Sequence, residues 1–351
     1  MKLSVLDQSA AAAGRGEDAA LRDTLELAAH CEALGYERFW VSEHHGMPTI
    51  VGTAPEVLMA AIAARTRRIR IGSAGVMLPH YSAYKVAEAF RVLDALAPGR
   101  IDLGVGRAPG SDRRTAQALN PHVSGMAEDF PEQVLDLQAW VSGLPHRGLV
   151  AHPCPPPGEP GRTPQVWILG SSDYGAQLAA HLGLPYAFAY FFMDGQGVEQ
   201  AMELYRRLYR PSARHPRPQP TICVWALAAD TDEQARHHAL SRERWRVDRM
   251  RGLLGPLRPP ASIEEEGFTV AELPTVQALR ARAFVGSAPR VAQQLRELAA
   301  SLALDELVIN TWAHDPAVRR RSYALLAAEF GLGDTQASRA VAPPAVAATL
   351  G

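Results

Sequence analysis

Four short segments carry residue types that could do chemistry, and each directly follows an apolar run. The first is Ser42-Glu43-His44-His45, which comes after Trp40-Val41. Histidine can give or take a proton near neutral pH, so His44 and His45 are candidate catalytic residues. Structural histidines and a metal site are the alternatives. The metal site is disfavoured because neighbouring side chains in extended chain point in opposite directions, and no other ligand spacing lies nearby.

The second segment, Gly104-Val105-Gly106-Arg107-Ala108-Pro109-Gly110, places an arginine at the end of an apolar run. A guanidinium can hold a phosphate through two parallel hydrogen bonds, so Arg107 is a candidate anion ligand. As a dinucleotide fingerprint the segment is weak, because the third glycine comes one residue late and arginine and proline occupy the turn. An ion pair of Arg107 with Asp102 or Asp112 is the alternative.

Two further segments combine small and polar residues after apolar runs. Gly170-Ser171-Ser172-Asp173 precedes a predicted helix, whose free N–H groups could bind a phosphate together with the serine hydroxyls. Ordinary capping by Ser172 or Asp173 is the alternative, and the two roles can coexist. The other segment, residues 72–79, is rich in small side chains that would let a flat ring lie against the backbone. A plain tight turn is the alternative there.

These segments need a scaffold that brings the ends of several strands together. Apolar runs predict eight strands, at residues 3–6, 38–41, 69–72, 101–105, 165–169, 186–189, 221–228 and 306–310. Helical patterns lie between them, at residues 19–34, 54–65, 82–96, about 126–141, 174–182, 198–209, 232–254 and 289–302. Strands that alternate with helices in one direction predict an α/β fold, a TIM (β/α)8 barrel, with its site at the carboxyl ends of the strands. A doubly wound open sheet is the alternative.

We expect one barrel domain over residues 1–330 and a flexible tail over residues 331–351, which is rich in Ala, Pro and Ser. The stretch from Gly255 to Phe284 interrupts the alternation before the last strand. It holds four prolines and the acidic run 264–266. Long insertions of this kind often act as lids, so we expect a mobile, lid-like segment.

Composition excludes some partners and compartments. The 351 residues hold 36 Lys and Arg against 37 Asp and Glu, a net charge of −1, which argues against a nucleic-acid partner. The chain start does not read as a signal peptide, and no uncharged stretch reaches the ~18 residues of a membrane span, so we expect a cytoplasmic protein. Cys31, Cys154 and Cys223 are few and widely spaced, as expected of reduced thiols rather than disulfides or a metal site.

Taken together, the motifs resemble the bacterial-luciferase-like flavin monooxygenases. The resemblance runs from about Leu3 to Leu326 and rests on WVSEHH, GSAGVMLP, PGRIDLGVGRAPG, WILGSSDYGAQLAAHLGLP and FVGSAPRVAQQL. Within that family the chain is similar to the actinomycete oxygenases that tailor aromatic polyketides in antibiotic biosynthesis, such as the epoxidase of the mensacarcin pathway. This likeness implies a TIM barrel that uses FMN.

The resemblance also implies roles for individual residues. His44 matches the family's catalytic histidine and His45 its neighbour, and Glu43 in the same motif is expected among the cofactor-binding residues. Gly106 stands where luciferase has a reactive cysteine, which argues against light emission. The remaining expected FMN contacts are Arg107, Ser171, Ser172 and Asp173 at the phosphate, and Ala74 and Gly75 beneath the ring, joined by a non-proline cis peptide.

The implied reaction begins with reduced FMN, delivered by a separate flavin reductase. Oxygen would add to give a peroxyflavin, which epoxidises or hydroxylates a small organic substrate, for example an aromatic polyketide. The sequence does not name that substrate, nor does it separate these reactions from a Baeyer–Villiger oxidation. Relatives also imply a homodimer through the helix from Ala54 to Arg65. An F420-dependent oxidoreductase on the same fold and a non-catalytic flavin-binding protein are the alternatives.

Overall fold

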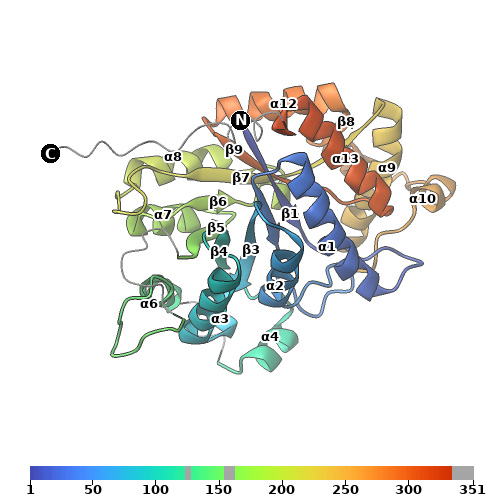
Figure 1. Cartoon of the computed structure of the whole chain (residues 1–351). Helices are drawn as coiled ribbons and strands as arrows, with labels where there is room; N and C mark the ends of the chain where they lie inside the picture. Colours follow the sequence, from blue (N-terminus) through green and yellow to red (C-terminus); the bar gives the residue numbers. More distant parts are fainter. Residues whose placement is uncertain (123–127, 154–162, 334–351) are drawn as a thin grey trace.

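A closed barrel of eight parallel strands forms the centre of the molecule (Figure 1). The computed structural model describes residues 1–122, 128–153 and 163–333. The barrel order is β6-β5-β4-β3-β2-β1-β9-β7, and β6 also pairs with β7. The predicted TIM barrel is therefore confirmed. Its strands are β1 (Lys2–Asp7), β2 (Arg38–Val41), β3 (Arg70–Met77), β4 (Ile101–Gly106), β5 (Gln165–Gly170), β6 (Tyr186–Phe188), β7 (Pro220–Ala229) and β9 (Glu306–Asn310).

Helices surround the barrel and bury one face each against it. On α12, for example, Val291, Leu295 and Ala299 recur every four residues and are all buried. The predicted helix α9 ends at Met250 rather than at residue 254, and α4 and α13 were not predicted. The predicted start of α6 near Met126 lies outside the described residues. The helices so far are α1 (Glu17–Leu34), α2 (Pro55–Arg65), α3 (Ala83–Leu96), α4 (Arg113–Leu119), α6 (Phe130–Val141), α7 (Asp173–Leu182), α8 (Val198–Leu208), α9 (Asp232–Met250), α12 (Ala288–Ser301) and α13 (Pro316–Glu329), with short 3-10 turns η1 (Leu78–His80) and η2 (Tyr190–Phe192).

A network of charged side chains fills one end of the barrel interior, and the middle of the interior is apolar. At the amino ends of the strands, Asp102 accepts hydrogen bonds from Arg38 (2.8 Å), Arg70 (2.5 Å) and the indole of Trp40 (3.0 Å). Glu306 accepts a further bond from Arg38 at 2.9 Å. Above this network lies a small apolar cluster of Leu6, Trp40, Trp167, Ala187, Cys223 and Val308. The interior can therefore open only toward the carboxyl ends of the strands, where barrel enzymes place their sites.

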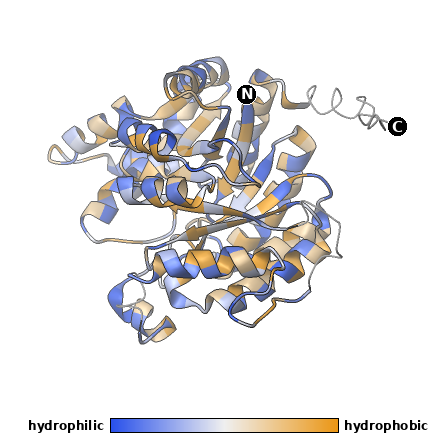
Figure 2. Ribbon diagram, turned by 90° about the vertical axis from the view of Figure 1, so that its left-hand side faces the viewer, coloured by the Kyte–Doolittle hydropathy of each residue, from blue (hydrophilic) through white to orange (hydrophobic). Residues whose placement is uncertain are grey.

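The main apolar core lies between the strands and the ring of helices. In Figure 2 orange segments run along the central strands, whereas most helices carry both orange and blue. Cys31 and Cys223 are free and buried, as expected of reduced thiols, and Cys154 lies outside the described residues.

The insertion before the last strand is present and is folded. It holds α10 (Pro260–Glu266) and α11 (Leu273–Ala281), and it leads into a ninth strand, β8 (Phe284–Ser287), which pairs with β7. Ion pairs tie it to α9: Glu272 accepts from Arg244 at 2.7 Å, and Arg280 donates to Glu243 at 2.7 Å. Its mobility as a lid stays a prediction. The predicted flexible tail lies, from residue 334 on, outside the described residues.

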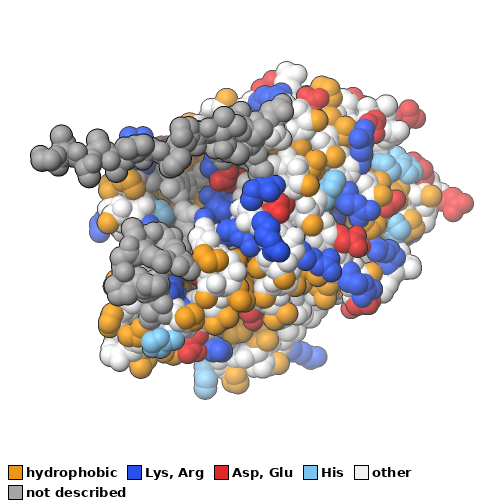
Figure 3. Space-filling model, in the orientation of Figure 1, with side chains coloured by type: hydrophobic (Ala, Val, Ile, Leu, Met, Phe, Trp, Pro, Cys, Tyr) orange, Lys and Arg blue, Asp and Glu red, His pale blue; other side chains and the backbone are white. Residues whose placement is uncertain are grey.

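On the outer surface, α2 and α3 expose apolar side chains. Val57 is 64% exposed, Val92 48% and Leu96 66%. In Figure 3 hydrophobic side chains gather on the lower half of the face, where Figure 1 places these two helices. Within the described residues, no helix is both long and apolar enough to span a membrane.

Candidate functional site

Two adjoining pockets open at the carboxyl ends of the strands. The barrel pocket is a cavity of about 310 Å³ that reaches down to Leu6, Trp40 and Cys223 inside the barrel. The α9 pocket, also about 310 Å³, lies between helix α9 and the loop that follows β2. The two pockets share walls made by Gln8, His44, Gly110, Phe191 and Phe192. Molecules in the two pockets would therefore contact the same five residues.

One end of the barrel pocket is suited to an anion. Arg107 follows β4 directly and stacks on Tyr174, with its guanidinium carbon 3.9 Å from the ring centroid. Ser172 is the first residue before α7, and its hydroxyl makes no capping hydrogen bond. The N–H groups of this helix end are thus left for a ligand, and Ser171 lies beside them in the pocket wall.

The ion-pair alternative for Arg107 is wrong. Asp102 is bonded to Arg38 and Arg70 inside the barrel. Asp112 caps α4 and accepts bonds from the N–H groups of Arg114 and Thr115. Arg107 is therefore held by its aromatic neighbour and not by either carboxylate.

Glycines make the floor of the barrel pocket flat. The peptide bond between Ala74 and Gly75 is cis, as expected, and lies in β3 beside a shift in the register with β4. A side chain at Gly75 would place its Cβ 2.5 Å from Leu169 and 2.9 Å from the backbone oxygen of Gly104. At Gly106 a Cβ would meet only the sulfur of Met77, at 3.6 Å, so there is free space. The tight-turn alternative for residues 72–79 is wrong, since most of this segment is strand.

His44 stands in the wall between the two pockets. It is half-buried, and its Nδ1 has no hydrogen-bond partner. Burial, followed by the charges of His45 and Arg249, lowers the pKa of His44 to about 4. The imidazole is therefore uncharged at neutral pH, and it lines both pockets.

His45 and Glu43 form a support behind His44. Glu43 is buried and shares its oxygens among three donors: His45 at 2.7 Å, the hydroxyl of Tyr81 at 2.7 Å, and the backbone N–H of Met77 at 3.1 Å. This ties the loop after β2 to the end of β3. Glu43 was expected to touch the cofactor, but it is not among the described residues that line either pocket. Its carboxylate instead orients His45, which lines the α9 pocket only.

Asp173 also differs from the expectation. It lies in the first turn of α7, yet its carboxylate accepts a hydrogen bond from Gln200 at 2.6 Å. It is not among the described residues lining the barrel pocket. The structure therefore brings Arg107, Ser171 and Ser172 together in the barrel pocket, whereas the carboxylate of Asp173 is bonded to Gln200.

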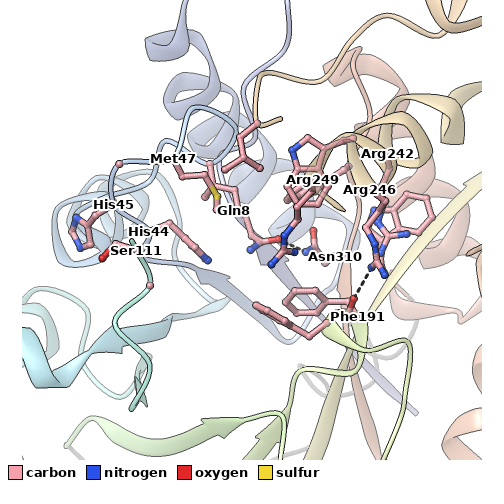
Figure 4. Close-up of a pocket in the computed structure, with 18 of the residues that line it drawn as sticks. Gln8, His44, His45, Met47, Ser111, Phe191, Arg242, Arg246, Arg249 and Asn310 are labelled. Atoms are coloured by element: carbon pink, nitrogen blue, oxygen red, sulfur yellow. Dashed lines mark hydrogen bonds between the residues drawn. The ribbon is translucent and has the colours of Figure 1, made fainter. Parts of the chain in front are cut away.

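Several pocket residues were missed from the sequence. Gln8 and Asn310 follow or end barrel strands, a position that could have revealed them, and they share a hydrogen bond of 2.6 Å. Spacing of four and three residues on α9 brings Arg242, Arg246 and Arg249 to one face (Figure 4). The aromatic lining of the α9 pocket consists of Phe191, Phe192, Trp225, Trp245 and Trp312.

Comparisons with known proteins agree with this geometry. A model of the luciferase-like monooxygenase family matches residues 1–306. A luciferase-like monooxygenase of Escherichia coli K12 is 39% identical over 322 residues, which cover 92% of this chain and 95% of the relative. An N-acetyl-S-alkylcysteine monooxygenase of Bacillus subtilis 168 is 37% identical over 334 residues, which cover 93% and 97%. The solved structure of apo-MsnO8 has a TM-score of 0.85 at 37% identity, covering 94% of this chain and 98% of that one.

Proposed function

Because this chain belongs to the luciferase-like monooxygenase family, we propose that it is an FMN-dependent monooxygenase acting on a small organic substrate. One observation carries the proposal. The barrel pocket joins an anion-binding end to a flat glycine floor, and its wall at His44 is shared with a second, aromatic pocket. The anion-binding end suits a phosphate, the flat floor suits a flat ring, and the second pocket suits a separate substrate.

The residues of the barrel pocket fit FMN. Arg107 and the uncapped helix end at Ser171 and Ser172 would hold the phosphate. The floor at Ala74 and Gly75 would carry the ring, since any larger residue at position 75 would collide with Leu169. When bound in its reduced form, FMN supplies the electrons that activate dioxygen. These electrons would be delivered with the flavin by a separate flavin reductase in the cytoplasm.

The chain's own contribution lies in the wall between the pockets. The uncharged His44 lines both pockets, so its imidazole can exchange a proton with a reacting group there. Glu43 and His45 keep the loop in place beneath it. The aromatic side chains of the α9 pocket would exclude water from the substrate, which limits wasteful release of peroxide.

An oxygen-labelling experiment tests the proposed function. The protein is loaded anaerobically with reduced FMN, and isotopically labelled dioxygen is then admitted with a candidate substrate. A first panel holds aromatic polyketides and N-acetyl-S-alkylcysteines, the latter taken from the name of a relative. We expect one labelled oxygen atom in the product. Binding of F420 but not of FMN would instead support the hydride-transfer alternative.

A further inference from the structure

The α9 pocket contains a buried positive charge without a carboxylate partner. Arg242 is 9% exposed and lies over the ring of Trp225, with its guanidinium carbon 4.0 Å from the centroid. Burial lowers the pKa of Arg242 to about 9, so the group is still protonated at neutral pH. A buried charge that has no ionic partner is costly, and proteins seldom keep one without a use for it.

The other buried arginines show how this protein normally satisfies such a group. In the described part of the chain each has a carboxylate within 4 Å: Arg38 has Asp102 and Glu306, Arg91 has Asp94, Arg244 has Asp248 and Glu272, and Arg319 has Asp7. Among the described ion pairs and hydrogen bonds, Arg242 takes part in none. Its neighbour Arg246 is already paired with Asp194 at 3.0 Å.

Other polar groups in the pocket walls also lack partners. The indole N–H groups of Trp225 and Trp312 are buried, and neither has a hydrogen-bond partner among the described residues. Arg249 stands at the exposed side of the pocket, against the rings of Phe192 and Trp245. Figure 4 shows Arg242, Arg246 and Arg249 approaching the cavity from α9, opposite His44.

Carboxylates are scarce in this pocket, although the buried side-chain oxygen of Asn310 is an acceptor without a partner among the described residues. Asp112 is the one carboxylate among the described lining residues, and its oxygens are occupied by the backbone and side chain of the first turn of α4. The pocket thus combines aromatic walls with an excess of positive charge. Flat apolar molecules that carry an acidic group match both properties.

We propose that the substrate of this enzyme is an organic anion with a flat apolar body, and that Arg242 binds its acidic group. The statement that this anion is the substrate rests on the proposed function. The anion site itself does not depend on flavin. Arg249 assists at the entrance. Arg107 binds a different anion, in the barrel pocket.

Equilibrium dialysis with two probes of equal shape tests the proposal. The probes are 2-naphthoate and its uncharged counterpart 2-naphthamide, each measured with the FMN-loaded and the flavin-free protein. We expect the wild-type chain to bind naphthoate at least about tenfold more tightly than naphthamide, the smallest effect of a hydrogen bond to a charged group. Equal affinities overturn the proposal, and this comparison needs no variant.

Variants of α9 then locate the effect. Arg242→Met, which keeps the length of the side chain, should lose about tenfold or more in naphthoate affinity and leave naphthamide binding unchanged. Arg236→Met, at an exposed position of the same helix, is the matched control and should bind both probes as the wild type does. A thermal melt verifies that each variant is folded. A preference for naphthoate that survives Arg242→Met overturns the assignment.

FMN binding separates this inference from the proposed function. Arg242→Met should bind FMN as tightly as the wild type, and a loss of FMN affinity would assign the guanidinium to the cofactor and overturn the proposal. If FMN does not bind to any form, whereas the naphthoate preference persists, the proposed function fails and the anion site stands. If FMN binds but the two probes bind equally, the inference fails alone.

Discussion

At the scale of the residue, the site depends on an imidazole kept uncharged and a guanidinium kept free of carboxylates. Burial gives His44 its low pKa, and the aromatic ring of Tyr174 holds Arg107 without neutralising it. Arg107 follows β4 directly and His44 is the third residue after β2, which is why their position alone predicted them. Arg242 could not be found in this way. Helix α9 carries several arginines. The orientation of the helix about its axis determines that Arg242 lines the pocket whereas Arg236 faces solvent.

Arg107→Ala should weaken the binding of reduced FMN by about 1.5–3 kcal/mol, the range for a hydrogen bond to a charged group. The reason is the loss of the only cation at the phosphate end among the described residues of the barrel pocket. Anaerobic titration of reduced FMN measures the change. Arg113→Ala, at an exposed position on α4, is the matched control. Unchanged affinity in Arg107→Ala would remove this residue from the site.

His44→Ala should lose turnover by about 10²–10⁴-fold, the usual contribution of general acid–base catalysis, and should still bind FMN. The measurement is substrate oxidised per reduced flavin consumed, because an uncoupled enzyme would still convert oxygen to peroxide. His45→Ala should also impair turnover, since it removes one of the three donors to the buried Glu43. Near-normal coupled turnover in His44→Ala would contradict the catalytic role and favour a flavin-binding protein without catalysis.

At the scale of the element, the apolar runs predicted the strands because both faces of a parallel barrel strand are buried. Strand β8 was missed, since its four residues include one buried side chain and give no apolar run. Helix α13 was missed although it carries a start signal, Asp315 followed by Pro316, and Asp315 does cap the helix. The insertion was expected to be mobile and its helices were not predicted; ion pairs with α9 hold them, and such long-range pairs cannot be derived from the sequence pattern.

The segment from Gly255 to Phe284 should become more resistant to trypsin when the pockets are filled. It packs on α9, which lines the α9 pocket, so a ligand that steadies α9 should steady the insertion too. Arg280 and Arg282 are exposed cleavage sites within it. Mass spectrometry of the digests with both pockets empty, and with FMN and 2-naphthoate present, locates the cuts. Equal protection in both states, or cleavage elsewhere, would count against a lid.

At the scale of the whole molecule, the exposed apolar surface of α2 and α3 favours assembly. Helix α2 buries Met59, Ile62 and Ala63 toward its own barrel and exposes Val57 on the other side. The helix also carries alanines at positions 60, 61, 63 and 64, and such small side chains would let a second helix approach closely. This supports the predicted homodimer through the helix from Ala54 to Arg65.

Light scattering at micromolar concentration should therefore give twice the mass of one chain. Val57→Glu should shift the mass toward the monomer, because it places a charge in the proposed interface. Val270→Glu, at a position that is 86% exposed on the insertion, is the matched control and should stay dimeric. A monomeric wild-type protein would refute the prediction.

The central claim is that the barrel pocket binds reduced FMN and controls its reaction with dioxygen. The most direct test mixes the anaerobic complex with dioxygen and follows two signals together, oxygen uptake and the return of oxidised-flavin absorbance. We predict that oxygen uptake precedes the return of oxidised-flavin absorbance. Arg107→Ala should remove the delay between the two signals at flavin concentrations too low to fill the variant's weakened FMN site. Two signals that coincide and match those of free reduced FMN would contradict the account.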